Sequence, residues 1–365
     1  MPKSDSVTIL KDLSESFGPS GFERETARIV MRYIKGYADE ISTDKLGSVI
    51  FRHDGSKKTP KVLLAGHIDE VGFVITGIDK STGFLTFNPL GGWFDQVLLG
   101  HRVIVRSKKG DIHGVIAAKP PHLLPPEERD KVVKLDHMYI DVGASSGEET
   151  EKMGIRIGDP VTPWSPFQLI RDDRIAVGKA FDDRVGSVIA LETLRRLKKE
   201  KVRHPNTVYG ATTVQEEVGL RGAGTVAHAV EPDVAIALDV DIAGDVPGIK
   251  PNEAPTKMGK GVSILTFDAS MIPNQALKRL VIETAEKEKI PYQLSVVARG
   301  GTDAGRFHIN RSGCPSIVIG VPVRHIHSHA AMVNLGDIEN AIKLNIALIQ
   351  RLDEKTVRSL TAIEA

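Results

Sequence analysis

The chain has 365 residues, more than one ordinary hydrophobic core needs, so we expect two domains. Its 48 lysines and arginines nearly balance 47 acidic residues, which gives no electrostatic reason to expect nucleic acid or an anionic membrane as a partner. A lone cysteine, Cys314, excludes an internal disulfide, and no stretch reads as a secretory leader or a membrane span. We therefore expect a cytoplasmic protein with a small ligand.

The first predicted helix covers residues 22–36. It follows Ser20-Gly21-Phe22-Glu23, which has the spacing of a capping box, and its apolar residues recur at helical intervals. Residues 61–65 then form a short apolar run typical of a strand buried on both faces. Because this run ends at Gly66-His67, we expect His67 at the carboxyl end of a strand.

The sequence pattern changes between residues 73 and 164. Short β-like runs alternate there with turn signals such as Gly91-Gly92, and no long helical period intervenes. We predict a small all-β module with the proline-rich stretch 120–126 as an exposed loop. We assign residues 73–165 to an inserted domain, and residues 1–72 with 166–365 to one discontinuous domain.

Helical and strand patterns alternate after the insertion. Helices are predicted over residues 185–197, 275–287 and 337–351, and buried strands over 207–214, 234–238 and 316–321. This alternation is typical of an α/β fold with a largely parallel sheet flanked by helices on both faces. Ligands bind such folds outside the carboxyl ends of the strands.

Two pairs of polar residues lie near predicted strand or helix ends. His67 and Asp69 are separated by one residue, so both side chains point to the same side of an extended segment. A carboxylate that accepts a hydrogen bond from a histidine makes that histidine a stronger metal ligand. Most such pairs, however, are surface hydrogen bonds. Asp182 and Asp183 precede the helix at 185–197, where one could cap the helix and one could bridge two cations.

Two acidic pairs follow predicted strands. Glu216-Glu217 follows the strand at 207–214, and Asp239 and Asp241 follow the strand at 234–238. Acids at these positions are common on solvated surfaces. In a metal hydrolase, one glutamate would bind a metal and its neighbour would take the proton from the activated water.

Three alternating histidines, His325, His327 and His329, follow the strand at 316–321 and would share one face of an extended segment. Their spacing does not indicate which of them binds a metal. Acids or histidines thus lie at the carboxyl ends of four strands of one predicted sheet. Two divalent cations would be balanced by three ligating carboxylates and a hydroxide, leaving one glutamate as a base. We therefore predict a two-metal hydrolase.

Five motifs, in this order, resemble those of the TET and glutamyl aminopeptidase family of dinuclear metallopeptidases: Gly66-His67-Ile68-Asp69-Glu70, Phe181-Asp182-Asp183-Arg184, Gln215-Glu216-Glu217, Ala237-Leu238-Asp239 and Ile326-His327-Ser328. The resemblance covers nearly the whole chain. It implies that Asp182 bridges two metals, that His67 and Asp239 bind one of them, and that Glu217 and His327 bind the other. It also implies Glu216 as the catalytic base, Asp69 as the carboxylate that orients His67, and a cis peptide between Asp182 and Asp183.

The same resemblance implies a zinc-peptidase-like α/β domain with an inserted PDZ-like dimerisation domain. Members of this family bind two divalent metal ions per subunit and assemble from dimers into dodecamers that admit peptides. We therefore expect two ions here, zinc or cobalt, and the same assembly. The expected reaction is the hydrolysis of N-terminal residues from peptides, in which Glu216 takes a proton from metal-activated water.

One glycine-rich segment and two arginines are candidates for contact with the substrate. The Gly300-Gly301-Thr302-Asp303-Ala304-Gly305 segment is expected to shape the substrate pocket. Arg324 or Arg221 is a candidate contact for an acidic substrate side chain. Two alternatives stay open, namely a deacylase or glycosidase on the same scaffold, and a catalytically silent assembly protein.

Overall fold

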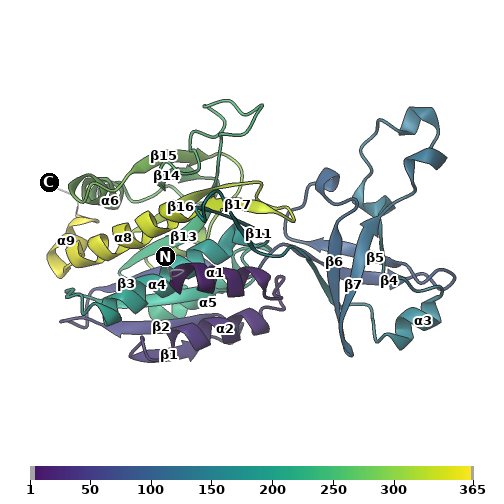
Figure 1. The fold of residues 1–365 in the computed structure, drawn as a ribbon. Coiled ribbons are helices and arrows are strands. Elements are labelled where there is room, and N and C mark those ends of the chain that lie inside the picture. The colour runs from purple at the N-terminus through teal and green to yellow at the C-terminus, as the bar shows by residue number, and fades with distance from the viewer. Residues whose placement is uncertain (1–4, 363–365) are drawn as a thin grey trace.

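The computed structural model describes residues 5–362, which form an α/β body and a β-barrel (Figure 1). Residues 1–4 and 363–365, at the ends of the predicted discontinuous domain, lie outside this range. Among the residues it covers, no helix is both long enough and apolar enough to cross a membrane.

The α/β body is built on a mixed sheet, to which residues 5–362 contribute eleven strands. Nine of them follow the order β1-β2-β12-β3-β13-β16-β17-β11-β10, while β14 pairs with β16 and β15 with β14. The strands are β1 (Glu40–Thr43), β2 (Val49–Asp54), β3 (Lys61–His67), β10 (Gln168–Ile170), β11 (Ile175–Gly178), β12 (Thr207–Thr213), β13 (Val234–Ile242), β14 (Val262–Asp268), β15 (Tyr292–Val297), β16 (Ser316–Arg324) and β17 (Ala331–Asn334).

The centre of this sheet is parallel and its flanks are antiparallel. Strands β12, β3, β13 and β16 run parallel to one another, whereas β1, β2, β17, β11 and β10 pair antiparallel. In β3, Val62 and Leu64 pack into one hydrophobic cluster, while Leu63 and Ala65 pack into another on the opposite face. Helices bury both faces of the sheet, so its central strand β3 can be apolar at successive positions.

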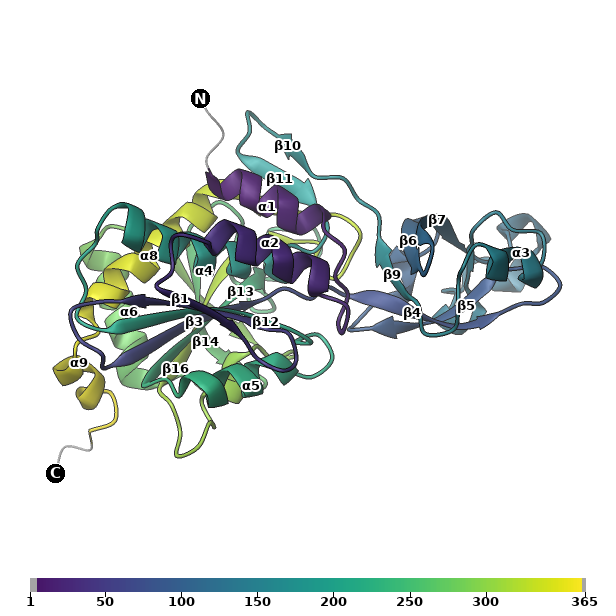
Figure 2. The ribbon, with the colours of Figure 1, turned by 90° about the horizontal axis from the view of Figure 1, so that it is seen from below.

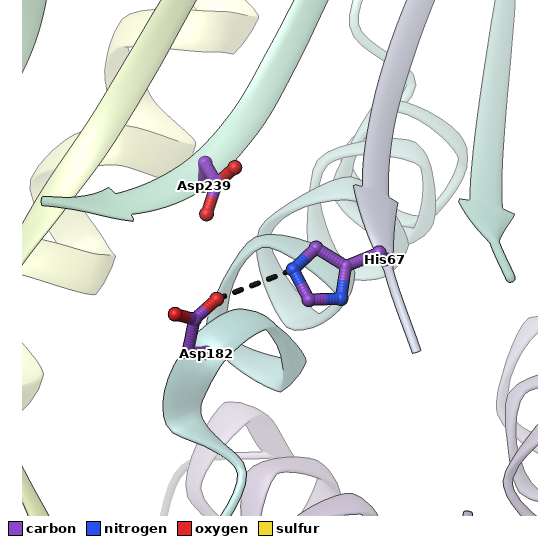
Figure 3. Close-up of side chains that lie close together, drawn as sticks. All are labelled: His67, Asp182 and Asp239. Atoms are coloured by element: carbon purple, nitrogen blue, oxygen red, sulfur yellow. Dashed lines mark hydrogen bonds and ion pairs between the residues drawn. The ribbon is translucent and has the colours of Figure 1, made fainter. Parts of the chain in front are cut away.

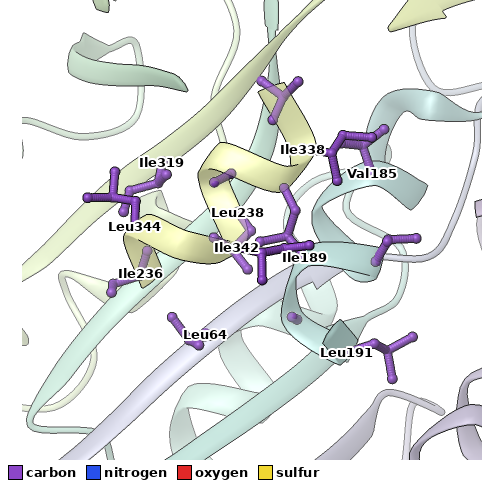
Figure 4. Packing of buried hydrophobic residues seen from close by; sticks show 14 of the residues in the cluster. Leu64, Val185, Ile189, Leu191, Ile236, Leu238, Ile319, Ile338, Ile342 and Leu344 are labelled. Atoms are coloured by element: carbon purple, nitrogen blue, oxygen red, sulfur yellow. The ribbon is translucent and has the colours of Figure 1, made fainter. Parts of the chain in front are cut away.

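Helices cover both faces of the sheet (Figure 2). The cluster that contains Leu64 includes residues of α1, α2, α4, α6 and α8, and Figure 4 shows Ile189 of α4 and Ile342 of α8 packed with Ile236 of β13. The opposite cluster includes residues of α5 and α7. The helices of this body are α1 (Asp5–Glu15), α2 (Arg24–Ile34), α4 (Phe181–Lys199), α5 (Arg221–Val230), α6 (Gln275–Lys287), α7 (Ala304–Phe307), α8 (Leu335–Arg351) and α9 (Glu354–Ser359).

The second body is a closed barrel of strand order β4-β5-β8-β7-β6-β9, with its own buried core around Phe73. Its strands are β4 (Gly72–Ile78), β5 (Leu85–Leu90), β6 (Arg102–Ser107), β7 (Gly110–Ala117), β8 (Tyr139–Asp141) and β9 (Pro160–Pro163). Short helices connect them, namely η1 (Asp95–Val97), η2 (Pro121–Leu123), η3 (Pro126–Glu128), η4 (Leu135–His137) and α3 (Gly147–Lys152). The proline-rich stretch 120–126 is largely exposed, as expected.

Two local predictions were wrong. The strand predicted over 234–238 continues to Ile242, because residues 239–242 go on pairing with β16. Ser20 does not cap α2, whose N-cap is Glu23, and its hydroxyl instead donates to Asp69 Oδ2 at 2.7 Å. A local spacing rule cannot detect an acceptor that lies 49 residues away in the chain.

Candidate metal centre

The predicted metal ligands converge at one end of the main sheet. His67 is the last residue of β3, Glu217 follows β12, and His327 follows β16. Asp239 lies within β13, and Asp182 lies at the start of α4. Because β12, β3, β13 and β16 are parallel, their carboxyl ends meet at the same edge of the sheet.

The first group of candidate ligands is formed by His67, Asp182 and Asp239 (Figure 3). One ligand atom from each lies within 4.8 Å of the others, and His67 Nε2 is 3.2 Å from Asp182 Oδ1. His67 Nδ1 points away from this group, toward the carbonyl oxygen of Asp69 at 3.2 Å. A carbonyl oxygen only accepts hydrogen bonds, so this contact favours a proton on Nδ1 and leaves Nε2 free to bind a metal.

The second group is formed by Asp182, Glu217 and His327, again within 4.8 Å. His327 Nε2 lies 3.2 Å from Asp182 Oδ2 and 3.5 Å from Glu217 Oε2. Asp182 thus belongs to both groups and directs one carboxylate oxygen to each histidine. A carboxylate in this position can bridge two cations.

The buried carboxylate of Asp69 holds three other site residues in place. Its Oδ1 lies 3.4 Å from His67 Nδ1 and accepts a hydrogen bond from the Glu216 backbone N–H at 3.0 Å, while its Oδ2 accepts from the Glu217 N–H at 3.1 Å. Burial by itself would raise the pKa of Asp69, but hydrogen bonds from His67 and Ser20 lower it below its ordinary value. Asp69 therefore remains an anionic acceptor that aligns the histidine with both glutamates.

The two aspartates at the start of α4 have different surroundings. Asp183 is fully buried and accepts backbone N–H groups from Gly186 at 2.8 Å and from His67 at 3.0 Å. It satisfies a donor in the first turn of the helix, as the capping interpretation requires, and leaves Asp182 to face the two candidate groups. The peptide between Asp182 and Asp183 is cis, as the family resemblance implied.

The expectation that three histidines share one face was wrong. His325 and His327 have φ values of 63° and 52°, so the segment turns through left-handed conformations instead of extending. His325 is exposed, His327 reaches Asp182, and His329 is buried against His101.

Several buried polar residues near the site have partners that the sequence did not predict. The Glu70 carboxylate accepts from Lys179 Nζ at 2.6 and 2.8 Å and lies 3.4 Å from Arg184 Nη2, and all three side chains are buried. Asp303 accepts from the Thr213 hydroxyl and is also buried. Charged residues usually lie at the surface, so sequence alone gave no signal for buried partners 90 or more residues apart.

The acids of the site are crowded in a buried space. Burial raises the pKa of Glu217 to about 8, with a further contribution from Asp182, and burial also raises the pKa values of Glu216 and Asp239 well above the ordinary range. Burial lowers the pKa of His327, but Asp182 and Glu217 outweigh this effect and raise it to about 10. Such an excess of negative charge favours bound cations.

The donor set fits divalent metals. Glu217 Oε1 is buried and has no hydrogen-bond partner among the described residues, as expected of an oxygen kept for a ligand. Imidazole and carboxylate donors suit zinc, cobalt and manganese. Each of the two groups could therefore hold one such ion.

A cavity of about 460 Å³ opens beside the two groups. Residues 300–302 of the glycine-rich segment line it, as expected, and so does Arg299, which the sequence prediction did not include. Neither predicted arginine is among the lining residues: Arg324 pairs with Asp245, and Arg221 donates to Gln215 Oε1. The expectation that one of them contacts the substrate has no support in this geometry.

The fold and the convergent ligands agree with the comparisons to known proteins. A model of the M42 glutamyl aminopeptidase family matches residues 47–344. The chain belongs to this family.

Individual relatives of this M42 chain match it over nearly its full length. It is 59% identical to a TET aminopeptidase from the marine sediment archaeon Thaumarchaeota archaeon SCGC AB-539-E09, with a TM-score of 0.96 and coverage of 98% of this chain and 99% of that one. It is 37% identical over 349 residues to the lysyl aminopeptidase of Pyrococcus furiosus, covering 94% of this chain and 96% of the relative. The Pyrococcus horikoshii TET1 peptidase, which can assemble into a tetrahedron or a large octahedral shell, is 32% identical, with a TM-score of 0.83 and coverage of 95% and 100%.

These comparisons confirm the predicted family, fold class and activity. The M42 chain is a metal-dependent aminopeptidase that hydrolyses N-terminal residues from peptides. They favour this activity over a deacylase, a glycosidase or a silent assembly protein. The names of the family and of the Pyrococcus furiosus relative differ in the N-terminal residue, glutamyl in one and lysyl in the other.

Proposed function

We propose that this aminopeptidase works with two divalent ions, zinc or cobalt, bridged by Asp182. The supporting observation is that the two oxygens of one carboxylate face two different histidines, His67 at 3.2 Å and His327 at 3.2 Å. In this proposal His67 and Asp239 complete one site, and Glu217 and His327 complete the other.

Bound ions would lower the pKa of a water molecule and polarise the carbonyl of the first peptide bond. Glu216 is the proposed general base, because its Oε2 lies 3.8 Å from His67 Nε2 and its side chain lines the cavity. Its carboxylate takes a proton from the attacking water and then passes it to the leaving amine. Asp69 positions this base through the Glu216 backbone N–H.

Replacement of the proposed base tests this assignment. We expect Glu216→Gln to keep both metals and to lose activity by a factor of about 10²–10⁴ on aminoacyl anilides, since the amide cannot accept the proton. Glu151→Gln, an exposed glutamate of α3, serves as the matched control. Metal content by mass spectrometry separates the loss of the base from the loss of ions, and a metal-loaded Glu216→Gln protein with normal turnover would exclude Glu216 as the base.

We also propose that the chain forms a homo-oligomer built from dimers, a dodecamer, which acts on peptides. The support for this assembly is the likeness to the TET1 peptidase. In this proposal the inserted domain, residues 73–165, supplies the dimer contact. Residues 1–72 and 166–365 carry the catalytic site. Native mass spectrometry tests it: a particle near twelve times 39.6 kDa is expected, and a monomer would contradict it. The cytoplasmic location stays a prediction from the sequence, which cell fractionation would test.

A further inference from the structure

The turn that carries His327 needs support from elsewhere in the fold. His325 and His327 both adopt left-handed backbone conformations, with φ values of 63° and 52°, which residues other than glycine rarely do. Such a turn persists only when its surroundings hold it. Part of this support comes from the turn itself, where the Ser328 hydroxyl donates to the His325 carbonyl at 2.6 Å.

The remaining support comes from the barrel. The segment 91–93 follows β5, and its Gly92 carbonyl oxygen lies 2.6 Å from His327 Nδ1. Because the carbonyl can only accept, Nδ1 must be the donor in this hydrogen bond. The bond therefore directs the other ring nitrogen, Nε2, toward Asp182 Oδ2, 3.2 Å away, so that Nε2 is the nitrogen placed to bind a metal.

The two glycines allow this close approach. Gly91 has a φ of +83°, and a Cβ atom there would lie 2.7 Å from Val71 and 3.2 Å from Glu217 Cβ. A Cβ atom on Gly92 would lie 3.3 Å from His327 Nδ1. The segment thus lies against Glu217 and His327, the two residues that belong to the second group alone.

Aromatic packing fixes the segment and the turn to each other. Trp93 donates its indole N–H to the Gly72 carbonyl at 3.1 Å and stacks on Phe73, with ring centroids 4.9 Å apart. Trp93 also packs on His329, which in turn stacks on His101 with ring centroids 3.7 Å apart. His329 is buried, and neither of its ring nitrogens has a hydrogen-bond partner among the described residues, so it acts here as a packing residue.

We propose that residues 91–93 and His101 of the barrel position one half of the metal centre. They hold His327 in the orientation and tautomer that bind a metal, and so they set the affinity of the Glu217–His327 site. In the other site, His67 is positioned by Asp69 and Asp183 of the α/β body, and no residue of the segment 91–93 takes part in these two contacts. This inference rests on the proposed two-metal function and gives the inserted barrel a role in the catalytic centre itself.

Metal titration of the Gly92→Ala variant tests the proposal. Protein stripped with a chelator is titrated with Co²⁺ alone and followed by calorimetry and visible absorption. We expect the affinity of one site to fall 10- to 100-fold and that of the other to change less than threefold, because residues behind a metal ligand typically have effects of this size. Gly224→Ala, which adds a methyl group to open space in α5, is the matched control and should bind Co²⁺ like the natural protein. The double variant Gly92→Ala/His327→Ala should bind no more weakly than His327→Ala, which assigns the effect to the same site.

A second variant guards against misfolding of Gly92→Ala. His101→Ala removes the ring behind His329 without touching a proposed ligand, and should weaken the same site at least threefold, whereas His101→Phe should restore it. The proposal is overturned if Gly92→Ala and His101→Ala bind both ions normally, or if both sites weaken equally. Natural protein that binds no Co²⁺ would instead overturn the two-metal function.

Discussion

Removal of the negative charge of Glu70 tests the buried ion cluster behind the site. Glu70 is 1% exposed and accepts two hydrogen bonds from Lys179, while Arg184 lies behind it fully buried. Glu70→Gln leaves both cations buried without the carboxylate that contacts them, which costs about 3–5 kcal/mol. With an unfolding entropy of about 2.1 cal/mol/K per residue, a chain of 365 residues that unfolds in one transition should lose about 4–7 °C in Tm.

Calorimetry of metal-free protein measures this loss without a contribution from metal affinity. The double variant Glu70→Gln/Lys179→Met should recover part of it, because one uncompensated charge is removed as well. Glu148→Gln is the control, since it breaks an exposed pair with Lys152 that is worth less than about 1 kcal/mol. A Glu70→Gln protein that melts within 1 °C of the natural one would refute the reasoning.

Three further predictions concern single groups. Burial raises the pKa of Cys314 from 9.0 to about 12, so at pH 8 its thiolate is about a thousandfold rarer than that of an exposed cysteine. A disulfide reagent should therefore label Cys314 about a thousandfold more slowly in the folded protein than in the unfolded one. Rapid labelling of the folded protein would contradict this. Burial raises the pKa of Asp337 from 3.8 to about 6, so the folded state binds this proton more tightly than the unfolded chain. Stability is then lost as pH rises from about 4 to about 6, by about 2 kcal/mol more in the natural protein than in Asp337→Asn, and urea unfolding that shows the same pH dependence for both proteins would contradict it. Asp69→Asn should weaken Co²⁺ binding about 10- to 100-fold, since the amide no longer provides the same acceptors to His67 and Glu216, and calorimetry with unchanged affinity would show that Asp69 is dispensable.

The central fold was predictable because its strands leave local signals. Apolar runs such as residues 61–65 form strands buried on both faces, and the short β-like runs after residue 73 form the barrel. The antiparallel flanking strands carry weaker signals: β1, for example, is exposed at all four positions. Pairing with β2 makes it a strand, and that pairing is not visible in its own residues.

The candidate site was predictable where its residues follow parallel strands of the central sheet. His67 ends β3 and Glu217 follows soon after β12, so the parallel pairing of these two strands brings the segments together at one edge. His327 was different, because its turn is left-handed and the spacing of three histidines could not single it out. Only the family resemblance selected it. The contacts of Gly92 and Glu70 depend on partners far away in the chain, and no local pattern reveals them.

The most direct test of the two-metal account is anomalous diffraction from crystals grown with Zn²⁺ or Co²⁺. The account predicts two anomalous peaks per chain on either side of the Asp182 carboxylate. One peak should be bound by His67 and Asp239, and the other by Glu217 and His327. A single peak, or peaks that Asp182 does not bridge, would contradict the central claim.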